Sequence, residues 1–200
     1  MRKLLLAAAA LLISGAAFGQ FGNIDWGVKA GMNISGLTNA DGIMGMGNSK
    51  MKPSIYLGLF AEFPLYTDFI AVQPELIYSR QGNRYESGGV KVWDRVNYLN
   101  IPVMFKFYVL EKLSVDVGPQ FGFRLNAKTK IKNGSTEKHS LTDDFKGLDL
   151  SFGMGASYKI NETIDVSFRY NLGLTKAYKY KNDGDKVKNS VIQLGAGYRF

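Results

Sequence analysis

Past residue 20, the chain alternates between apolar residues and small or polar residues in eight separate segments. In each segment apolar side chains fill one face, whereas Gly, Ser, Asn and a few charged residues fill the other. An alternation of period two is typical of β-strands with one apolar face. We therefore predict an all-β chain whose strands span residues 24–37, 54–64, 70–81, 98–107, 113–126, 148–159, 164–173 and 192–200.

The connections between these segments alternate strictly between short and long. The short turns are residues 64–69, 110–112 and 161–163. The long polar loops, which show no periodicity, are residues 37–53, 82–95, 129–146 and 176–190. This alternation places all long loops at one end and both termini at the other, as in bacterial outer-membrane barrels. Each segment also has about the 9 to 11 residues with which a tilted strand crosses a bilayer. The sequence thus predicts an eight-stranded antiparallel up-and-down transmembrane β-barrel.

Two prolines fall inside predicted strands. Pro102 and Pro119 lack the backbone N–H that a strand donates to its neighbour. A closed barrel has no free edge at which this missing donor is harmless. We therefore expect a bulge or locally broken pairing at both sites.

The first 19 residues differ in kind from the rest. Arg2 and Lys3 precede an apolar run from Leu4 to Ile13, and the small-residue stretch 16–19 follows. This order is typical of a secretory signal peptide. We predict that residues 1–19 are removed and that residues 20–200 form the barrel domain. The chain has no cysteine, which excludes disulfides, a lipid-modified N-terminal cysteine and cysteine-ligated metals.

A secreted soluble barrel of the lipocalin type remains an alternative, because it also has eight alternating strands, with the apolar face inward. Against it, the polar face holds mainly Gly, Ser and Asn rather than the Lys, Glu and Thr of a water-facing sheet. Aromatic residues also gather near strand ends, as membrane interfaces favour. They are Trp26, Phe63, Phe107, Tyr158, Tyr198 and Phe200.

Charged residues on the inward face need partners, because buried charges persist only when they are paired. Lys106 and Asp116 are equidistant from one short turn, and Lys159 and Asp165 from another, so we expect direct cross-strand pairs. The charges predicted to form a ring near the periplasmic end are Asp25, Glu62, Lys106, Asp116, Lys159, Asp165 and Arg199. A second network is predicted higher in the barrel, from Lys29, Glu75, Arg124 and Arg169.

These networks have two interpretations. One is a polar core that satisfies itself, and the other is a plug that opens to conduct small solutes. Because side chains fill the interior of an eight-stranded barrel, we expect little or no conductance.

Several stretches resemble one family. They read GVKAGMNISGL at 27–37, PELIYSRQG at 74–82, YLNIPVMFKFYV at 98–109, VGPQFGFRLNAK at 117–128 and LGAGYRF at 194–200. These stretches resemble the PorT-like outer-membrane β-barrel proteins of the Bacteroidetes, although Asn100 stands where an acidic residue is common. The resemblance implies the barrel fold, the outer membrane and a Gram-negative source. Phe200 resembles the terminal signal that the barrel-assembly machinery recognises in its clients.

The family's namesake is linked to the type IX secretion system. The resemblance therefore leaves open an envelope accessory protein that acts through a protein partner.

The sequence offers little catalytic chemistry. His139, the only histidine, falls in a predicted loop beside Ser140 and near Glu137. A lipid-modifying hydrolase needs such groups within hydrogen-bond reach of one another, and adjacent loop residues seldom meet that need. Glycine pairs lie on strands rather than in a phosphate-binding turn. We therefore predict no catalytic residues, no cofactor and no metal site.

The net charge of the chain is +8, of which Arg2 and Lys3 contribute two. The four long loops together carry the remaining +6, so the positive charge is expected at the outer rim. Phosphate groups of lipopolysaccharide, rather than nucleic acid, are the natural partners of such a rim. The candidate contacts are Lys179, Lys181, Lys186 and Lys188. The sequence thus favours a non-enzymatic structural or interaction protein embedded in outer-membrane lipid.

Overall fold

The computed structural model describes residues 24–38, 49–65, 69–81, 83–87, 90–133, 135–140, 147–176 and 188–200. The predicted signal peptide, residues 1–19, lies outside these ranges. None of the described residues belongs to a helix long and apolar enough to cross a membrane. The strands are β1 (Asp25–Thr38), β2 (Ser49–Pro64), β3 (Ile70–Gln81), β4 (Asn83–Ser87), β5 (Val90–Leu110), β6 (Leu113–Asn133), β7 (Ser135–Ser140), β8 (Leu148–Lys159), β9 (Ile164–Lys176) and β10 (Lys188–Arg199).

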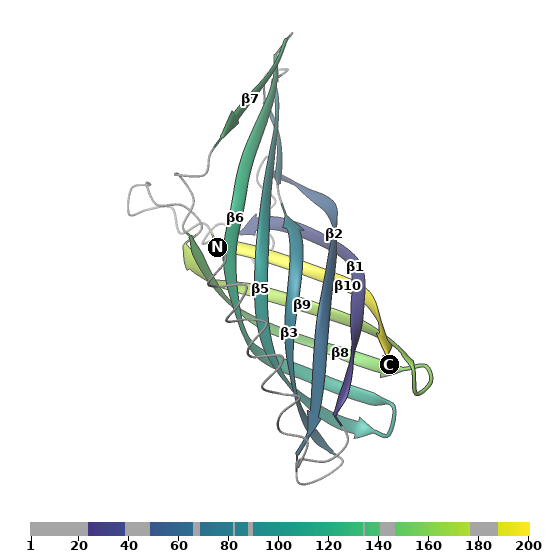
Figure 1. Ribbon diagram of the computed structural model, residues 1–200. Coiled ribbons are helices and arrows are strands. Elements are labelled where there is room, and N and C mark those ends of the chain that lie inside the picture. Colours follow the sequence, from purple (N-terminus) through teal and green to yellow (C-terminus); the bar gives the residue numbers. More distant parts are fainter. Residues whose placement is uncertain are drawn as a thin grey trace.

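Eight of these strands close into an antiparallel barrel (Figure 1). Their order around the wall is β1, β2, β3, β5, β6, β8, β9 and β10. The last strand then pairs with the first, from Gly27 opposite Arg199 to Thr38 opposite Lys188. This closure confirms the predicted fold, and it leaves the eight long strands without a free edge in the barrel wall.

The apolar face of the barrel points outward. Ile55 and Leu57 expose 62% and 61% of their surface, whereas Tyr56 between them exposes 4%. Polar and charged residues such as Asn33 and Glu75 are buried in the interior. This polarity is the reverse of a lipocalin-type barrel, so the transmembrane prediction is confirmed.

The prolines interrupt the pairing between strands but leave the register unchanged. At Pro102, the proline and the residue before it have no paired residue in the β3–β5 ladder. The ladder then resumes in the same register. Beside Pro119, the β5–β6 ladder is interrupted in the same way. Locally broken pairing is thus confirmed at both predicted sites. Pro74 produces a third such gap, between β2 and β3, that the alternation alone did not predict.

The prediction of long loops without regular structure at residues 82–95 and 129–146 is partly wrong. Strand β5 already begins at Val90 and β6 continues to Asn133, and the short strands β4 and β7 pair beside them. In Figure 1, β5, β6 and β7 rise well beyond the rest of the barrel. We call the paired residues 83–87, 90–95, 127–133 and 135–140 the extracellular sheet, because they lie at the end of the long connections.

Candidate functional site

Glu75 on β3 is the centre of a fully buried group of polar residues. The two terminal nitrogens of Arg169 lie 2.8 and 2.7 Å from its two carboxylate oxygens. Lys29 Nζ lies 2.8 Å from Oε1, and Gln73 Nε2 donates to the same oxygen at 2.6 Å. We call these four residues the Glu75 cluster. Each buried charge in it has an opposite charge at hydrogen-bond distance, which offsets the cost of removing it from water.

Glu62 on β2 is the centre of a second group, nearer the periplasmic end. Its Oε2 lies 3.1 Å from Lys106 Nζ and 3.1 Å from Arg199 Nη2. Its Oε1 lies 3.7 Å from Lys159 Nζ and also accepts a hydrogen bond from the Tyr108 hydroxyl. These five residues form the Glu62 cluster.

In both clusters a cation reaches across the lumen. Arg169 comes from β9 and Glu75 from β3, which are four strands apart around an eight-stranded wall. Lys159 on β8 and Glu62 on β2 are likewise four strands apart. The other ion pairs of the clusters join strands two places apart in the wall. The ion pairs therefore connect opposite walls as well as nearer strands, and their side chains occupy the centre of the barrel.

Gln73 joins the two clusters. Its Nε2 donates to Glu75, and its Oε1 accepts a hydrogen bond of 3.2 Å from Lys106 Nζ. Polar contacts therefore continue without a break from the middle of the barrel to its periplasmic mouth.

A chain of neutral side chains lies in the lumen above the Glu75 cluster, toward the extracellular end. Asn171 donates to Gln193 at 2.9 Å, Gln193 to Asn33 at 3.0 Å, and Asn33 to Ser79 at 2.8 Å. These four buried residues come from β9, β10, β1 and β3.

The cross-strand charge pairs follow the predicted register but differ in their contacts. Lys106 lies opposite Asp116, and Lys159 opposite Asp165. Lys106, however, contacts Glu62, whereas Asp116 accepts hydrogen bonds from the hydroxyls of Ser114, at 2.6 Å, and Ser157. Lysine has a long side chain, so it reaches past its register partner to a carboxylate that gathers several donors.

The other predicted lumen residues occupy several levels. Arg199 lies opposite Gly27 and pairs with Asp165 at 3.3 Å as well as with Glu62. Asp25 lies opposite Glu62 at the barrel mouth. Arg124 lies opposite Tyr98, and its backbone N–H donates to Gly147. Two cations of the predicted second network, Lys29 and Arg169, therefore form ion pairs with Glu75.

The predicted surface residues fall mostly outside the described chain. Lys179, Lys181 and Lys186 lie there, whereas Lys188 begins β10 opposite Thr38. His139 is in strand β7, opposite Thr129, and not in a loop.

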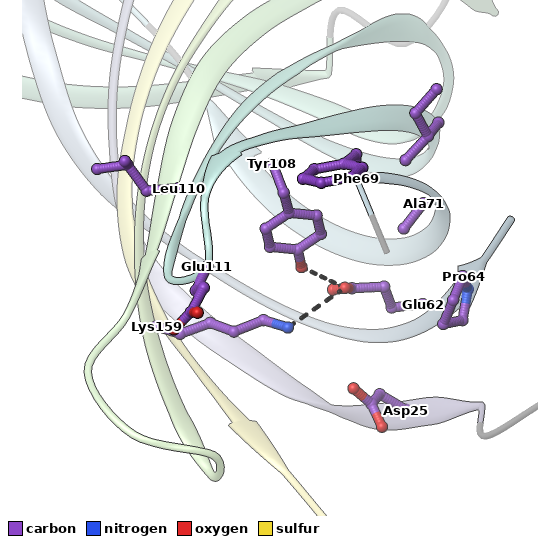
Figure 2. Close-up of a pocket in the computed structure, with 10 residues that line it drawn as sticks. Asp25, Glu62, Pro64, Phe69, Ala71, Tyr108, Leu110, Glu111 and Lys159 are labelled. Atoms are coloured by element: carbon purple, nitrogen blue, oxygen red, sulfur yellow. Dashed lines mark hydrogen bonds and ion pairs between the residues drawn. The ribbon is translucent and has the colours of Figure 1, made fainter. Parts of the chain in front are cut away.

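A pocket of about 330 Å³ opens at the periplasmic mouth. In Figure 2, the Tyr108 hydroxyl and the Lys159 ammonium both point to Glu62 on its wall. The described lining residues include no Ser, Thr, Cys or His. The described chain also has no group of three or more His, Cys, Asp or Glu arranged to hold a metal. The remaining lining residues are Asp25, Pro64, Phe69, Ile70, Ala71, Leu110 and Glu111.

Two residues of these clusters were missed in the sequence. Tyr108 follows Lys106 on the inward face of β5, so continuing the alternation by one step would have found it. Gln73 falls on the polar face of the predicted strand 70–81, but an uncharged side chain gives no sign that it joins two charged clusters.

Three comparisons place the chain among known proteins. The family described as outer membrane protein beta-barrel domain matches residues 18–179. The comparison with curated proteins found no match. Among solved structures, Ail of Yersinia pestis in complex with the heparin analogue sucrose octasulfate has a TM-score of 0.51 at 20% identity, over 89% of this chain and 99% of that one.

Two further structures are similar. Neisserial surface protein A has a TM-score of 0.51 at 11% identity, over 89% of this chain and 99% of that one. A major outer membrane protein from Thermus thermophilus has a TM-score of 0.50 at 13% identity, over 89% and 100%. At these identities the similarity is one of fold.

Proposed function

Because this chain belongs to the outer membrane protein beta-barrel domain family, we propose that it is a non-enzymatic structural and interaction protein, a closed scaffold that holds extracellular strands at the cell surface. The protein lies in the outer membrane of a Gram-negative bacterium. The observation that carries the proposal is the cross-lumen network of the Glu62 and Glu75 clusters. These side chains occupy the path that a solute would take, so the barrel serves as an anchor rather than a channel.

Conductance measurements test the closed scaffold. The purified barrel, inserted into planar bilayers, is expected to give no stable single-channel steps at moderate voltage. A porin inserted in parallel shows that the assay detects open barrels. Reproducible steps of constant size from this protein would overturn the proposal of a closed scaffold.

The surface partner in this proposal is lipopolysaccharide. The long connections carry the net positive charge of the barrel domain, and fixed cations at the outer rim attract lipid phosphates. The first candidates are Lys179, Lys181, Lys186 and Lys188. Their simultaneous replacement by Gln is expected to weaken the association of purified lipopolysaccharide with the barrel. Sucrose octasulfate, the ligand of Ail in its complex, is the competitor that separates lipid phosphates from a soluble polyanion.

A second candidate function is an envelope accessory role, in keeping with the resemblance to PorT-like proteins of the Bacteroidetes. The observation in its favour is the periplasmic pocket, where the exposed side chains of Phe69 and Leu110 lie near Asp25 and Glu111. An apolar rim with acidic groups suits a protein partner with basic residues.

Photo-crosslinking tests the accessory role. With p-benzoylphenylalanine at position 111, a specific partner protein is expected to crosslink in native membranes. The same probe at Phe121, which faces lipid, provides the control. Identical products from both positions would argue against a partner at the pocket.

A further inference from the structure

The register of the extracellular sheet assigns all its Lys and Arg residues to positions of one face. The register aligns Arg84 with Trp93, Trp93 with Lys130, and Lys130 with Lys138 across four strands. Within these described strands, the same face holds one acidic residue, Glu86, and the opposite face holds no Lys or Arg. We call this surface the basic face; its cationic residues are Arg84, Lys91, Arg95, Lys128, Lys130, Lys132 and Lys138.

The alternation of residues along β5 shows that this face continues the outer, lipid-facing side of the barrel wall. Its register with β3 and β4 is constant along its length. In the barrel, Phe105 and Phe107 are exposed on the lipid side, whereas Met104 and Lys106 are buried in the lumen. Odd-numbered residues of β5 are therefore on the outer wall, which places Lys91, Trp93 and Arg95 on its upward continuation.

Strand β6 reaches the same arrangement through a β-bulge. Within the barrel its even-numbered residues, such as Asp116 and Gln120, face the lumen. The register with β5 then shifts by one residue, which leaves Leu125 as the extra residue on β6. A shift of one residue exchanges the two faces of a strand. Because of it, the three lysines at 128, 130 and 132 are placed on the continuation of the outer wall instead of above the lumen.

We propose that the basic face binds the phosphate groups of lipopolysaccharide molecules that surround the barrel in the outer leaflet. This inference rests on the proposed function and assigns its lipid contact to specific strands. The basic face stands above the lipid-facing wall, at the side where headgroups of the outer leaflet gather. Neighbouring strands lie about 4.8 Å apart, so these positions form a close two-dimensional array that suits multivalent anions.

The geometry favours membrane lipid over a soluble polyanion. A soluble ligand would meet the sheet from any direction, and the opposite face and the region above the lumen would serve equally well. Lipid headgroups meet the sheet only from outside the barrel, and this is the side to which the register assigns the positions of the basic residues. Trp93 among them also suits a position at the membrane interface.

A rearranged variant tests the inference without changing composition or net charge. Each lysine of β6 is exchanged with its preceding neighbour: Ala127→Lys with Lys128→Ala, Thr129→Lys with Lys130→Thr, and Ile131→Lys with Lys132→Ile. The variant moves three lysines to the opposite face. A matched loop variant, Lys179→Gln with Lys181→Gln and Lys186→Gln, removes three lysines from the 176–190 connection. Heat-modifiable mobility on gels confirms that each barrel is folded.

Binding is measured by titrating each folded protein with purified lipopolysaccharide, with the same lipid after its phosphates have been removed, and with sucrose octasulfate. The face-exchange variant is expected to bind intact lipopolysaccharide about tenfold or more weakly than the wild type, and the loop variant to show a much smaller loss of affinity than the face-exchange variant. Removal of the phosphates is expected to abolish the difference between the proteins.

The outcomes separate the inference from the proposed function. If only the loop variant loses binding, the basic face is not the site, although the proposed lipid contact stands. If the wild type binds lipopolysaccharide no better than the dephosphorylated lipid, both fail. Binding of sucrose octasulfate by the wild type without binding of lipopolysaccharide would overturn the lipid assignment in favour of a soluble polyanion.

Discussion

Arg169 and Glu75 are 94 residues apart in sequence, yet both terminal nitrogens of the guanidinium contact the carboxylate, at 2.8 and 2.7 Å. The pair spans the lumen from β9 to β3. Two parallel hydrogen bonds fix the distance as well as the orientation between opposite walls. The pair therefore acts as a brace that holds the barrel closed at mid-height.

Removal of the carboxylate charge is predicted to be costly. Glu75→Gln leaves Arg169 and Lys29 buried close together without their counter-charge. Breaking a buried ion pair from one side costs about 3 to 5 kcal/mol. We expect a loss of this size in the free energy of unfolding, measured by urea titration in lipid vesicles. Glu111→Gln, at an exposed turn position, is the control and should lie within about 0.5 kcal/mol of the wild type. Equal effects of the two substitutions would contradict the brace.

The two lysines of the Glu62 cluster should differ in importance. The side chain of Lys106 exposes 2% of its surface, whereas that of Lys159 exposes 26%, and both contact Glu62. Water screens a partly exposed pair, so Lys159→Met should cost about 0 to 1 kcal/mol. Lys106→Met removes a buried partner of Glu62 and Gln73 and should cost about 2 to 3 kcal/mol.

The measurement for these lysines is urea unfolding at low and high salt. Only the small effect of Lys159→Met should shrink further as salt is added. A larger cost for Lys159→Met than for Lys106→Met would show that burial does not determine the strength of these pairs.

The seam between the first and last strands is predicted to depend on an aromatic contact. The rings of Trp26 and Phe200 lie 4.6 Å apart, and Phe200 N–H donates to Trp26 O at 3.0 Å. In a double-mutant cycle, Trp26→Leu and Phe200→Leu should show a coupling energy of about 0.5 to 1.5 kcal/mol. The cycle of Trp26→Leu with Phe121→Leu, a lipid-facing ring on β6, should show none. Equal coupling in both cycles would mean that the seam contact contributes nothing specific.

The barrel itself was predictable because period two extends through every membrane-crossing segment. Lipid imposes an apolar outer face along each strand, so both polarity and register follow from local sequence. Above the membrane that constraint ends. Val90 and Val92 alternate with Lys91 and Trp93, but here the register assigns the positions of Lys91 and Trp93, rather than the valines, to the outer face. The sequence pattern therefore predicts a polar loop where the chain forms strands.

The contacts inside the lumen were only partly predictable, because register gives neighbours and not partners across the barrel. Turn symmetry placed Lys106 opposite Asp116, as the structure has it. The contact of Lys106 with Glu62 depends instead on which carboxylate gathers most donors in a narrow interior. Similarly, counting charge along the sequence hid the basic face. The charges of residues 82–95 and 129–146 nearly cancel along the chain and separate only when the strands pair and Leu125 bulges.

Gly195 is predicted to be required because Tyr56 fills the space beside it. Gly195 lies opposite Gly31, and a Cβ at Gly195 would overlap the Tyr56 hydroxyl oxygen. Overpacking of this kind costs about 1 to 3 kcal/mol, so Gly195→Ala should lower the free energy of unfolding by that amount. In a Tyr56→Phe background the same substitution should cost less, because the overlapping oxygen is gone. Gly147→Ala, with no atom within 4 Å of the new methyl group, is the matched control. A cost for Gly195→Ala that is unchanged by Tyr56→Phe would assign the strain to the neighbouring backbone instead.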